Sequence, residues 1–260
     1  MLAFGLTVIA GLSTGIGGAV ALLTKKTSTH FLSVSLGFSA GVMLYVSMIE
    51  IFAEAQSILQ AALSPKKGAA ITVAAFFGGM LFIGLIDKLI PDDKNPHEFK
   101  KNRESGFAGE TNLMRTGMFT ALAIAIHNFP EGLATFVSAL QEPSVAIPIV
   151  VAIAIHNIPE GIAVAVPVYY ATGSKSKAFL LSLASGLAEP LGALIGFAIL
   201  MPFMNEVLFG IIFAGIAGIM VFISLDELLP AAREYGEHHL SIYGLVAGMA
   251  LMAVSLLLFM

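Results

Sequence analysis

Long apolar runs, separated by short polar or glycine- and proline-containing breaks, make up most of this chain. A membrane-spanning helix needs about 20 mostly apolar residues, and eight runs reach that length. They lie at 2–23, 32–57, 68–90, 114–140, 145–170, 177–201, 206–230 and 240–259. The pattern therefore predicts an all-α polytopic membrane protein with eight transmembrane helices in a single domain, residues 1–260.

The composition agrees with this prediction. Hydrophobic residues make up 57% of the chain and charged residues only 12%, which is too apolar for a soluble domain. The absence of Cys excludes disulfides and thiolate metal sites. We expect a lipid bilayer around the chain and no nucleic-acid partner.

The basic residues predict the orientation of the segments. Cytoplasmic connections of membrane proteins are enriched in Lys and Arg. Of the 13 basic residues, only Lys66 and Lys67 fall outside the connections that follow segments one, three, five and seven. Those connections are therefore expected to be cytoplasmic and both termini extracytoplasmic, in a multi-pass protein of the cell's inner (plasma) membrane. Residues 91–113, rich in charge, Pro and Gly, are predicted to be a flexible cytoplasmic loop.

One motif occurs twice, as AIAIHNFPEGLA at 123–134 and AIAIHNIPEGIA at 152–163. Each copy places His, Asn and Glu in a segment otherwise apolar enough to be buried in a membrane. Polar side chains at that depth are costly and indicate a functional site. Because consecutive spanning segments run in opposite directions, the copies are antiparallel, and their polar clusters meet at a common depth.

A weaker repeat surrounds the motif. The run GVMLYVSMIEIFAEA at 41–55 matches GIMVFISLDELLPAA at 218–232, with Glu50 aligned to Glu227. The two runs are predicted to point in opposite directions. Segments one to three are therefore expected to be related by inversion to segments six to eight, around a central pair (3+2+3). Such inverted repeats are typical of secondary transporters.

The side chains of the motif suit a divalent metal. Imidazole and carboxylate ligands without thiolate are typical of Zn²⁺, Fe²⁺, Mn²⁺ and similar ions. Two Glu side chains can each bridge two ions, while the His pair holds one ion and the Asn pair the other. Pro130 and Pro159 are expected to kink their helices and free carbonyl oxygens inside the protein. The predicted ligands are His127, Asn128, Glu131, His156, Asn157 and Glu160.

Other acidic residues lie outside the motif. Glu189, in SGLAEPLG, can complete a second cation position; a carboxylate kept protonated between helices is the alternative. Glu50 lies toward the outer end of its segment, and Asp226 and Glu227 lie toward the inner end of theirs. They can form acidic vestibules that attract cations. For Asp226, an ordinary helix-end position is an equally good interpretation.

The chain resembles the ZIP family (Zrt-, Irt-like proteins) of divalent metal transporters over essentially its whole length. The resemblance is carried by HNFPEG at 127–132, HNIPEGIAVAVPVYYATGSK at 156–175, SGLAEPLG at 185–192 and GIMVFISLDELLP at 218–230. It implies an eight-helix bundle with a binuclear site. One metal would be held by His127, Glu131, His156 and Glu160, and the second by Asn128, Glu131, Asn157, Glu160 and Glu189.

We therefore expect a carrier and not an enzyme. By this resemblance it imports Zn²⁺, and also Fe²⁺, Mn²⁺, Co²⁺ or Cd²⁺, through alternating access, with the metal as substrate and no prosthetic group. A divalent cation channel and an intramembrane di-metal enzyme are the alternatives. The enzyme is disfavoured because the sequence has no HExxH or Glu-x-x-His motif. Whether the protein forms a homodimer is left open.

Overall fold

The computed structural model describes residues 2–23, 29–89, 110–141, 143–234 and 238–259, and these residues form helices and turns without a strand. The all-α prediction is therefore confirmed for them, and each of the eight predicted segments falls on helix. The helices are α1 (Leu2–Leu23), α2 (Thr29–Tyr45), α3 (Phe52–Ala62), α4 (Pro65–Leu89), α5 (Glu110–Gln141), α6 (Pro143–Thr172), α7 (Lys175–Gly186), α8 (Ala188–Leu200), α9 (Glu206–Ile223), α10 (Leu229–Glu234) and α11 (His238–Phe259). Two π-helical segments, η1 (Val46–Ile51) and η3 (Ser224–Leu228), and a short 3₁₀ turn, η2 (Met201–Phe203), complete the described elements.

Six of these helical stretches are long and apolar enough to cross a membrane. They are Leu2–Val20, Ser33–Ala62, Pro65–Ile86, Lys175–Ile199, Glu206–Arg233 and His239–Leu257. In α6 the apolar run is shorter, Ile153–Tyr169. The structure is thus that of a polytopic membrane protein with about six to eight apolar helices.

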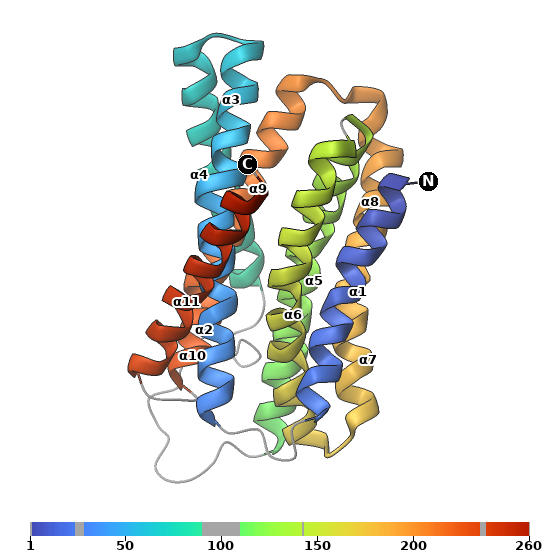
Figure 1. Ribbon diagram of the computed structural model, residues 1–260, viewed down its shortest axis with the longest axis vertical. Helices are drawn as coiled ribbons and strands as arrows, with labels where there is room; N and C mark the ends of the chain where they lie inside the picture. Colours follow the sequence, from blue (N-terminus) through green and yellow to red (C-terminus); the bar gives the residue numbers. More distant parts are fainter. Residues whose placement is uncertain (1, 24–28, 90–109, 142, 235–237, 260) are drawn as a thin grey trace.

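The helices pack as two groups (Figure 1). The motif bundle consists of α1, α5, α6, α7 and α8, in which α6 lies against α1 and α5, and α5 also lies against α8. The partner bundle consists of α2, α3, α4, α9, α10 and α11, in which α2 packs on α11 and α4 on α9. The two bundles meet where α2 contacts α6 and α9 contacts α5.

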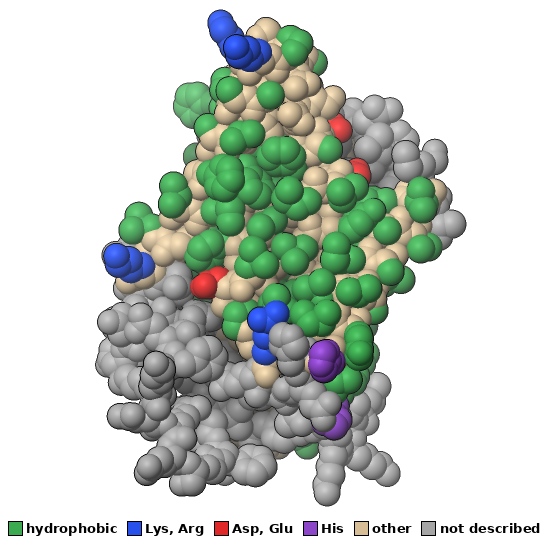
Figure 2. Space-filling model, turned by 90° about the vertical axis from the view of Figure 1, so that its left-hand side faces the viewer, with side chains coloured by type: hydrophobic (Ala, Val, Ile, Leu, Met, Phe, Trp, Pro, Cys, Tyr) green, Lys and Arg blue, Asp and Glu red, His purple; other side chains and the backbone are tan. Residues whose placement is uncertain are grey.

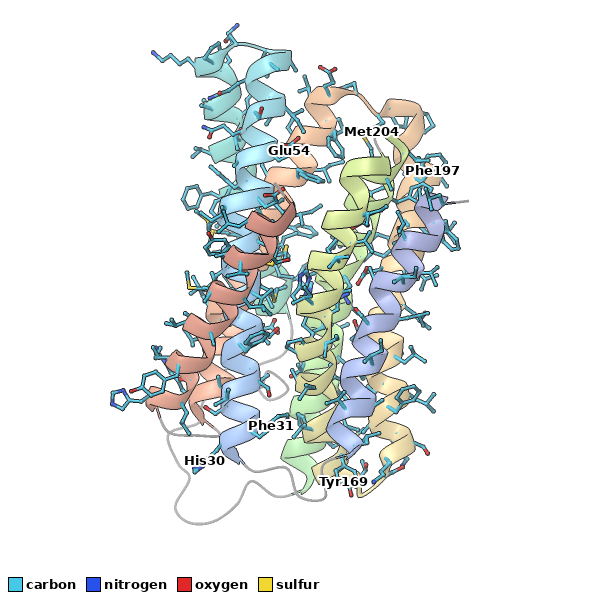
Figure 3. The ribbon with its side chains drawn as sticks, viewed as in Figure 1. His30, Phe31, Glu54, Tyr169, Phe197 and Met204 are labelled. Carbon is cyan, nitrogen blue, oxygen red and sulfur yellow. The ribbon has the colours of Figure 1, made fainter. Side chains whose placement is uncertain are left out.

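The runs that form the outer sequence repeat lie in the partner bundle and point in opposite directions. The chain rises in Figure 3 from His30 and Phe31 at the start of α2 to Glu54 on α3, and descends from Met204 along α9 to α10. Each run contains one of the π-helical segments, with η1 packed on α9 and η3 on α2. The π-helical turns were not predicted from the sequence.

Glycines allow the closest helix contacts of the partner bundle. A Cβ on Gly41 of α2 would overlap the backbone carbonyl of Leu245 on α11. A Cβ on Gly218 of α9 would overlap that of Phe76 on α4. In an apolar environment, where burial of apolar surface drives little association, such close packing is a main source of helix–helix affinity.

The outer surface of the partner bundle is apolar. On α4, the side chains of Phe77, Leu81, Phe82 and Leu85 are all more than half exposed. Figure 2 shows hydrophobic side chains over the middle of this face, with lysine and arginine side chains at its upper end and in its lower part. A continuous apolar surface of this kind fits the hydrocarbon core of a bilayer.

Most of the predicted loop 91–113 lies outside the described residues. The last residues of this segment, 110–113, are helical, because α5 begins at Glu110. Glu110 and Thr111 start a helix that continues without interruption into the first motif. The polar sequence there is compatible with the end of a helix that extends beyond the apolar run.

Candidate metal centre

Each of the two motif copies lies within one long helix. α5 is continuous through Pro130, and α6 is continuous through Pro159. A proline removes one helical hydrogen bond, but its fixed φ is compatible with helix, so a long packed helix can contain it. The motif side chains therefore project from two helices that lie side by side.

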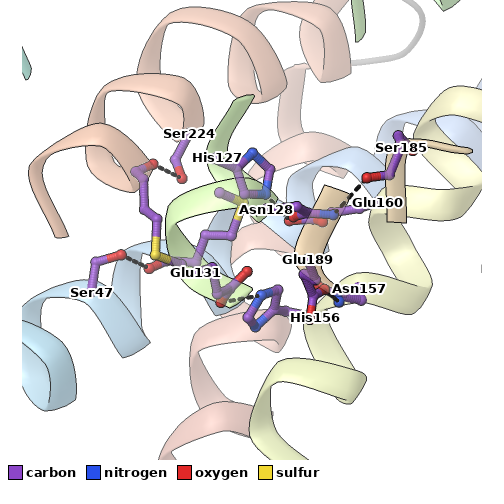
Figure 4. Close-up of polar contacts among 12 residues, drawn as sticks. Ser47, His127, Asn128, Glu131, His156, Asn157, Glu160, Ser185, Glu189 and Ser224 are labelled. Atoms are coloured by element: carbon purple, nitrogen blue, oxygen red, sulfur yellow. Dashed lines mark hydrogen bonds and ion pairs between the residues drawn. The ribbon is translucent and has the colours of Figure 1, made fainter. Parts of the chain in front are cut away.

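The histidine of each copy pairs with the glutamate of the other (Figure 4). His127 Nε2 lies 3.0 Å from Glu160 Oε1, and His156 Nε2 lies 3.1 Å from Glu131 Oε1. All four side chains are buried, with at most 3% of any of them exposed. The structure thus brings the four residues together as two crossed pairs between α5 and α6, not as pairs within one helix.

The asparagines bond to the helices that flank the motif pair. Asn128 Nδ2 donates to the Ser185 carbonyl on α7 at 3.4 Å, and Asn157 Nδ2 donates to the Ala10 carbonyl on α1 at 3.0 Å. Asn157 Nδ2 also donates to the carboxylate of Glu189. Both asparagines are fully buried, so these bonds hold their amide groups in the centre of the motif bundle.

Glu189 lies just after the single-residue interruption between α7 and α8. α7 ends at Gly186, and α8 begins at Ala188, so Glu189 lies in the first turn of α8. A helix N-terminus favours a nearby negative charge, and a proline is tolerated in a first turn, which suits Pro190. The carboxylate is fully buried. The Gly186 and Pro190 flanks were a sequence signal for this break that our prediction of one continuous segment did not use.

Several buried polar atoms of the centre have no hydrogen-bond partner among the described residues. They include Asn128 Oδ1, Asn157 Oδ1, Glu131 Oε2, Glu160 Oε2, Glu189 Oε2 and His156 Nδ1. Leaving such atoms unpaired costs free energy in an apolar interior. Most of them are oxygen acceptors, and a cation among them would satisfy several at once. The donor set therefore fits a divalent metal as cargo.

The side chains are not already arranged as a cage. Within the described residues, no three His, Asp or Glu side chains are grouped as a ready metal site. The crossed His–Glu pairs account for this, because each imidazole is directed at a carboxylate. A metal entering the centre would have to displace these pairs.

The three candidate pathway residues lie outside the centre, in the π-helical segments. Glu50 is exposed in η1, and Asp226 and Glu227 are half-buried in η3. Glu50 lies between Ser47 and the upper end of α3, whereas Glu227 lies between Ser224 and the lower end of α10. Glu50 therefore follows Ser47 in the direction of the upper side, and Glu227 follows Ser224 in the direction of the lower side.

The serines of the two π-helical segments make the same contact. Ser47 Oγ donates to the Met43 carbonyl at 2.6 Å, and Ser224 Oγ donates to the Met220 carbonyl at 2.7 Å. All four residues are fully buried. Figure 4 shows these contacts beside the His–Glu pairs, so the π-helical turns face the centre from the partner bundle.

Known proteins are similar to this chain over most of its length. The model of the ZIP zinc transporter family matches residues 87–256, which is most of the chain and includes both motif copies and Glu189. The chain belongs to the ZIP family. The family is one of transporters, so the alternative of an intramembrane enzyme is excluded.

Curated relatives are similar over nearly their full lengths. The zinc transporter ZupT of Streptococcus mutans serotype c is 67% identical over 257 residues, covering 99% of this chain and 97% of that protein. ZupT proteins of Lysinibacillus sphaericus and Clostridium perfringens are 62% and 59% identical, with at least 96% of each chain covered. These ZIP relatives contain no large domain that this chain lacks.

Proposed function

We propose that this ZIP protein is a carrier that imports Zn²⁺, and also Fe²⁺, Mn²⁺, Co²⁺ and Cd²⁺, into the cytoplasm through a binuclear site. The observation that carries the proposal is the crossed pairing of two buried imidazoles with two buried carboxylates across α5 and α6. Neutral imidazole and carboxylate are the ligands that such ions prefer in the absence of thiolate.

The first cation would be held by the four paired side chains. Each imidazole would turn its Nε2 from the glutamate to the ion, and the carboxylates would supply the negative charge that a divalent ion needs in a low-dielectric interior. Because the His–Glu pairs reform when the ion leaves, each of these four side chains regains a partner in the metal-free centre. Reversible exchange of this kind suits a carrier, whose cargo must be released. The four ligands are His127, Glu131, His156 and Glu160.

The second cation would lie between the asparagines, next to the first. The support is the set of unpaired buried oxygens there, which includes both amide carbonyls and Oε2 of Glu189. Glu131 and Glu160 would bridge the two ions with their second oxygens. Glu189 would bring the count of buried carboxylates to three, opposite two divalent charges.

The same proposal includes eight membrane crossings in a 3+2+3 inverted repeat, in the plasma membrane and with both termini outside the cytoplasm. The start of α1 and the end of α11 both lie in the upper half of Figure 1, toward the turn between α3 and α4. That turn carries Lys66 and Lys67, whereas nearly all other basic residues precede or follow the lower ends of helices. This asymmetry supports a cytoplasmic location for the lower side, since cytoplasmic connections are enriched in Lys and Arg.

Alternating access would come from movement of one bundle against the other. Transporters built from inverted repeats expose a midplane site to each side in turn by such movement. The centre belongs to the motif bundle, and the π-helical turns of the partner bundle face it. Glu50 on the outer side and Asp226 and Glu227 on the inner side would attract cations toward the two openings.

The proposal is tested by zinc uptake into proteoliposomes. The double variant Glu131→Ala, Glu160→Ala should insert and purify normally but take up no radiolabelled zinc. Undiminished uptake by this variant would contradict the site. Saturation of the wild-type rate at micromolar zinc, with counter-transport from zinc-loaded vesicles, is expected of a carrier; a linear, non-exchanging flux would indicate a channel.

A further inference from the structure

The contacts that α1 makes with the motif helices recur in the contacts of α7 and α8. Asn157 donates to the Ala10 carbonyl on α1, and Asn128 donates to the Ser185 carbonyl on α7. The two acceptors are 185 − 10 = 175 residues apart, while the donors have the spacing of the motif copies, 157 − 128 = 29. α1 and the α7–α8 segment therefore occupy equivalent places around the motif pair.

Glycine contacts extend this correspondence. A Cβ on Gly161 would overlap the backbone carbonyl of Thr14, and a Cβ on Gly132 would overlap the backbone carbonyl of Glu189. The spacings are again 189 − 14 = 175 and 161 − 132 = 29. Thr14 on α1 is therefore the positional counterpart of Glu189 on α8.

The side chain of Thr14 is buried and its hydroxyl is unsatisfied. Thr14 is 0% exposed, and its Oγ1 has no hydrogen-bond partner in the described part of the chain. The side chain packs on the backbone of Gly186, next to the Ser185 carbonyl that accepts the bond from Asn128. Asn128 Oδ1 is likewise buried without a partner among the described residues. On the other side of the centre, the corresponding asparagine, Asn157, bonds to the carboxylate of Glu189.

We propose that Thr14 is a further residue of the second cation position. Its hydroxyl oxygen faces the cation from the side opposite Glu189 and binds it directly or through one water molecule. This inference rests on the proposed function, because it concerns the same binuclear site. It accounts for two buried polar atoms, Thr14 Oγ1 and Asn128 Oδ1, whose lack of a partner among the described residues is costly in free energy.

Glu189 and Thr14 differ in charge, and this difference affects how strongly the second position binds a cation. Glu189 supplies a charge, whereas Thr14 supplies a neutral oxygen that ends closer to its backbone. A fourth carboxylate would raise the affinity for a divalent ion, since affinity rises with ligand charge. A neutral hydroxyl in its place completes the ligand set and keeps the second ion weakly bound, as release requires.

The test is calorimetric titration of the full-length protein in detergent with Zn²⁺ alone. The wild type should show two binding events of unequal affinity. Thr14→Val removes the hydroxyl at nearly constant volume. It should reduce the zinc affinity of the lower-affinity event alone, by about three- to tenfold, which corresponds to the loss of one neutral polar contact. Thr14→Ser keeps the hydroxyl and should bind as the wild type does. Thr14→Ala is a second hydroxyl-free variant, and it separates the loss of the hydroxyl from the packing of the one methyl group that Thr14→Val adds.

The outcomes separate this inference from the proposed function. If Thr14→Val and Thr14→Ala bind zinc like the wild type while Glu189→Gln weakens the second event, Thr14 is no part of the site. If Thr14→Ser and Thr14→Val weakened zinc binding equally, the inference would also be overturned, because a change in packing alone would then explain the effect. A wild type with fewer than two zinc events, or a His127→Ala, His156→Ala variant that binds zinc normally, would overturn the binuclear site itself.

Discussion

Gly132 on α5 lies directly against Glu189 on α8. A Cβ at Gly132 would overlap the carbonyl oxygen and the α-carbon of Glu189. The missing side chain thus lets α8 approach α5 closely enough for the buried carboxylate of Glu189 to meet Asn157. The glycine of the HNFPEG motif therefore positions a residue that the motif does not contain.

Replacing this glycine should separate the two helices. Gly132→Ala is expected to lower the free energy of unfolding by about 1–3 kcal/mol, the usual cost of overpacking. It should also weaken zinc binding, because Glu189 would be displaced from the centre. Thermal unfolding of the purified protein with a chelator measures the first effect, and zinc titration measures the second.

Gly78 on α4 provides the matched control. A Cβ there would meet nothing within 4 Å. In an open helical position alanine is preferred over glycine by up to about 1 kcal/mol, so Gly78→Ala should melt at or above the wild-type temperature. If Gly132→Ala had a melting temperature as high as that of Gly78→Ala, the close contact between Gly132 and Glu189 would be contradicted.

The crossed His127–Glu160 pair should couple the two residues in the metal-free protein. Replacing either by alanine leaves the other buried without its partner, whereas replacing both removes the whole interaction. We therefore expect the double variant to be less destabilised than the sum of the single variants, with a coupling of about 0.5–3 kcal/mol. Denaturant unfolding in detergent with a chelator measures this double-mutant cycle.

An exposed acidic residue supplies the control for the cycle. Glu206 lies at the start of α9, on the surface. His127→Ala combined with Glu206→Ala should be additive within about 0.5 kcal/mol, as for independent sites. Additivity of the His127 and Glu160 variants as well would show that their 3.0 Å approach does not stabilise the metal-free centre.

The composition of the centre was predictable from the sequence, but its pairing was not. The doubled motif identified His127, Glu131, His156 and Glu160 because ionisable side chains are costly inside a membrane, and a repeated set of them indicates a functional site. The sequence did not indicate which histidine meets which glutamate. The structure pairs each histidine with the glutamate of the other copy, since the distance between α5 and α6 decides which side chains meet, and that distance depends on packing against α1 and α8.

Local features such as the π-helical turns could not be predicted from the sequence patterns either. The matched Glu50 and Glu227 pointed to related runs, but apolar periodicity cannot distinguish a π-helical turn from a regular one. Likewise Thr14 is an ordinary polar residue in a glycine-rich helix until the contacts of Glu189 show its equivalent position. Such features depend on contacts between distant segments, which a single segment does not encode.

The two serine hydrogen bonds in the π-helical segments should contribute similar amounts to the free energy of unfolding. Ser47→Ala and Ser224→Ala each remove one buried hydrogen bond to a methionine carbonyl and are expected to lower the free energy of unfolding by about 1 kcal/mol. Ser57→Ala, at an exposed position of α3, should have no measurable effect. Thermal unfolding of the three variants in the same detergent compares them. An effect at Ser47 with none at Ser224 would mean that the two π-helical turns are not equivalent.

Glu50 should affect the rate of zinc entry rather than zinc affinity. Its carboxylate is exposed on the proposed outer side, where a negative charge raises the local concentration of cations. Glu50→Gln is expected to lower the initial uptake rate several-fold at low ionic strength and by less at about 0.5 M salt, where screening shortens the range of the field. Calorimetric zinc affinity should stay unchanged. Glu206→Gln removes the same charge at the same end of the molecule but away from η1, and should leave the rate near the wild-type value. A salt-independent loss of uptake in Glu50→Gln would indicate that Glu50 binds the ion directly and is part of the transport path itself.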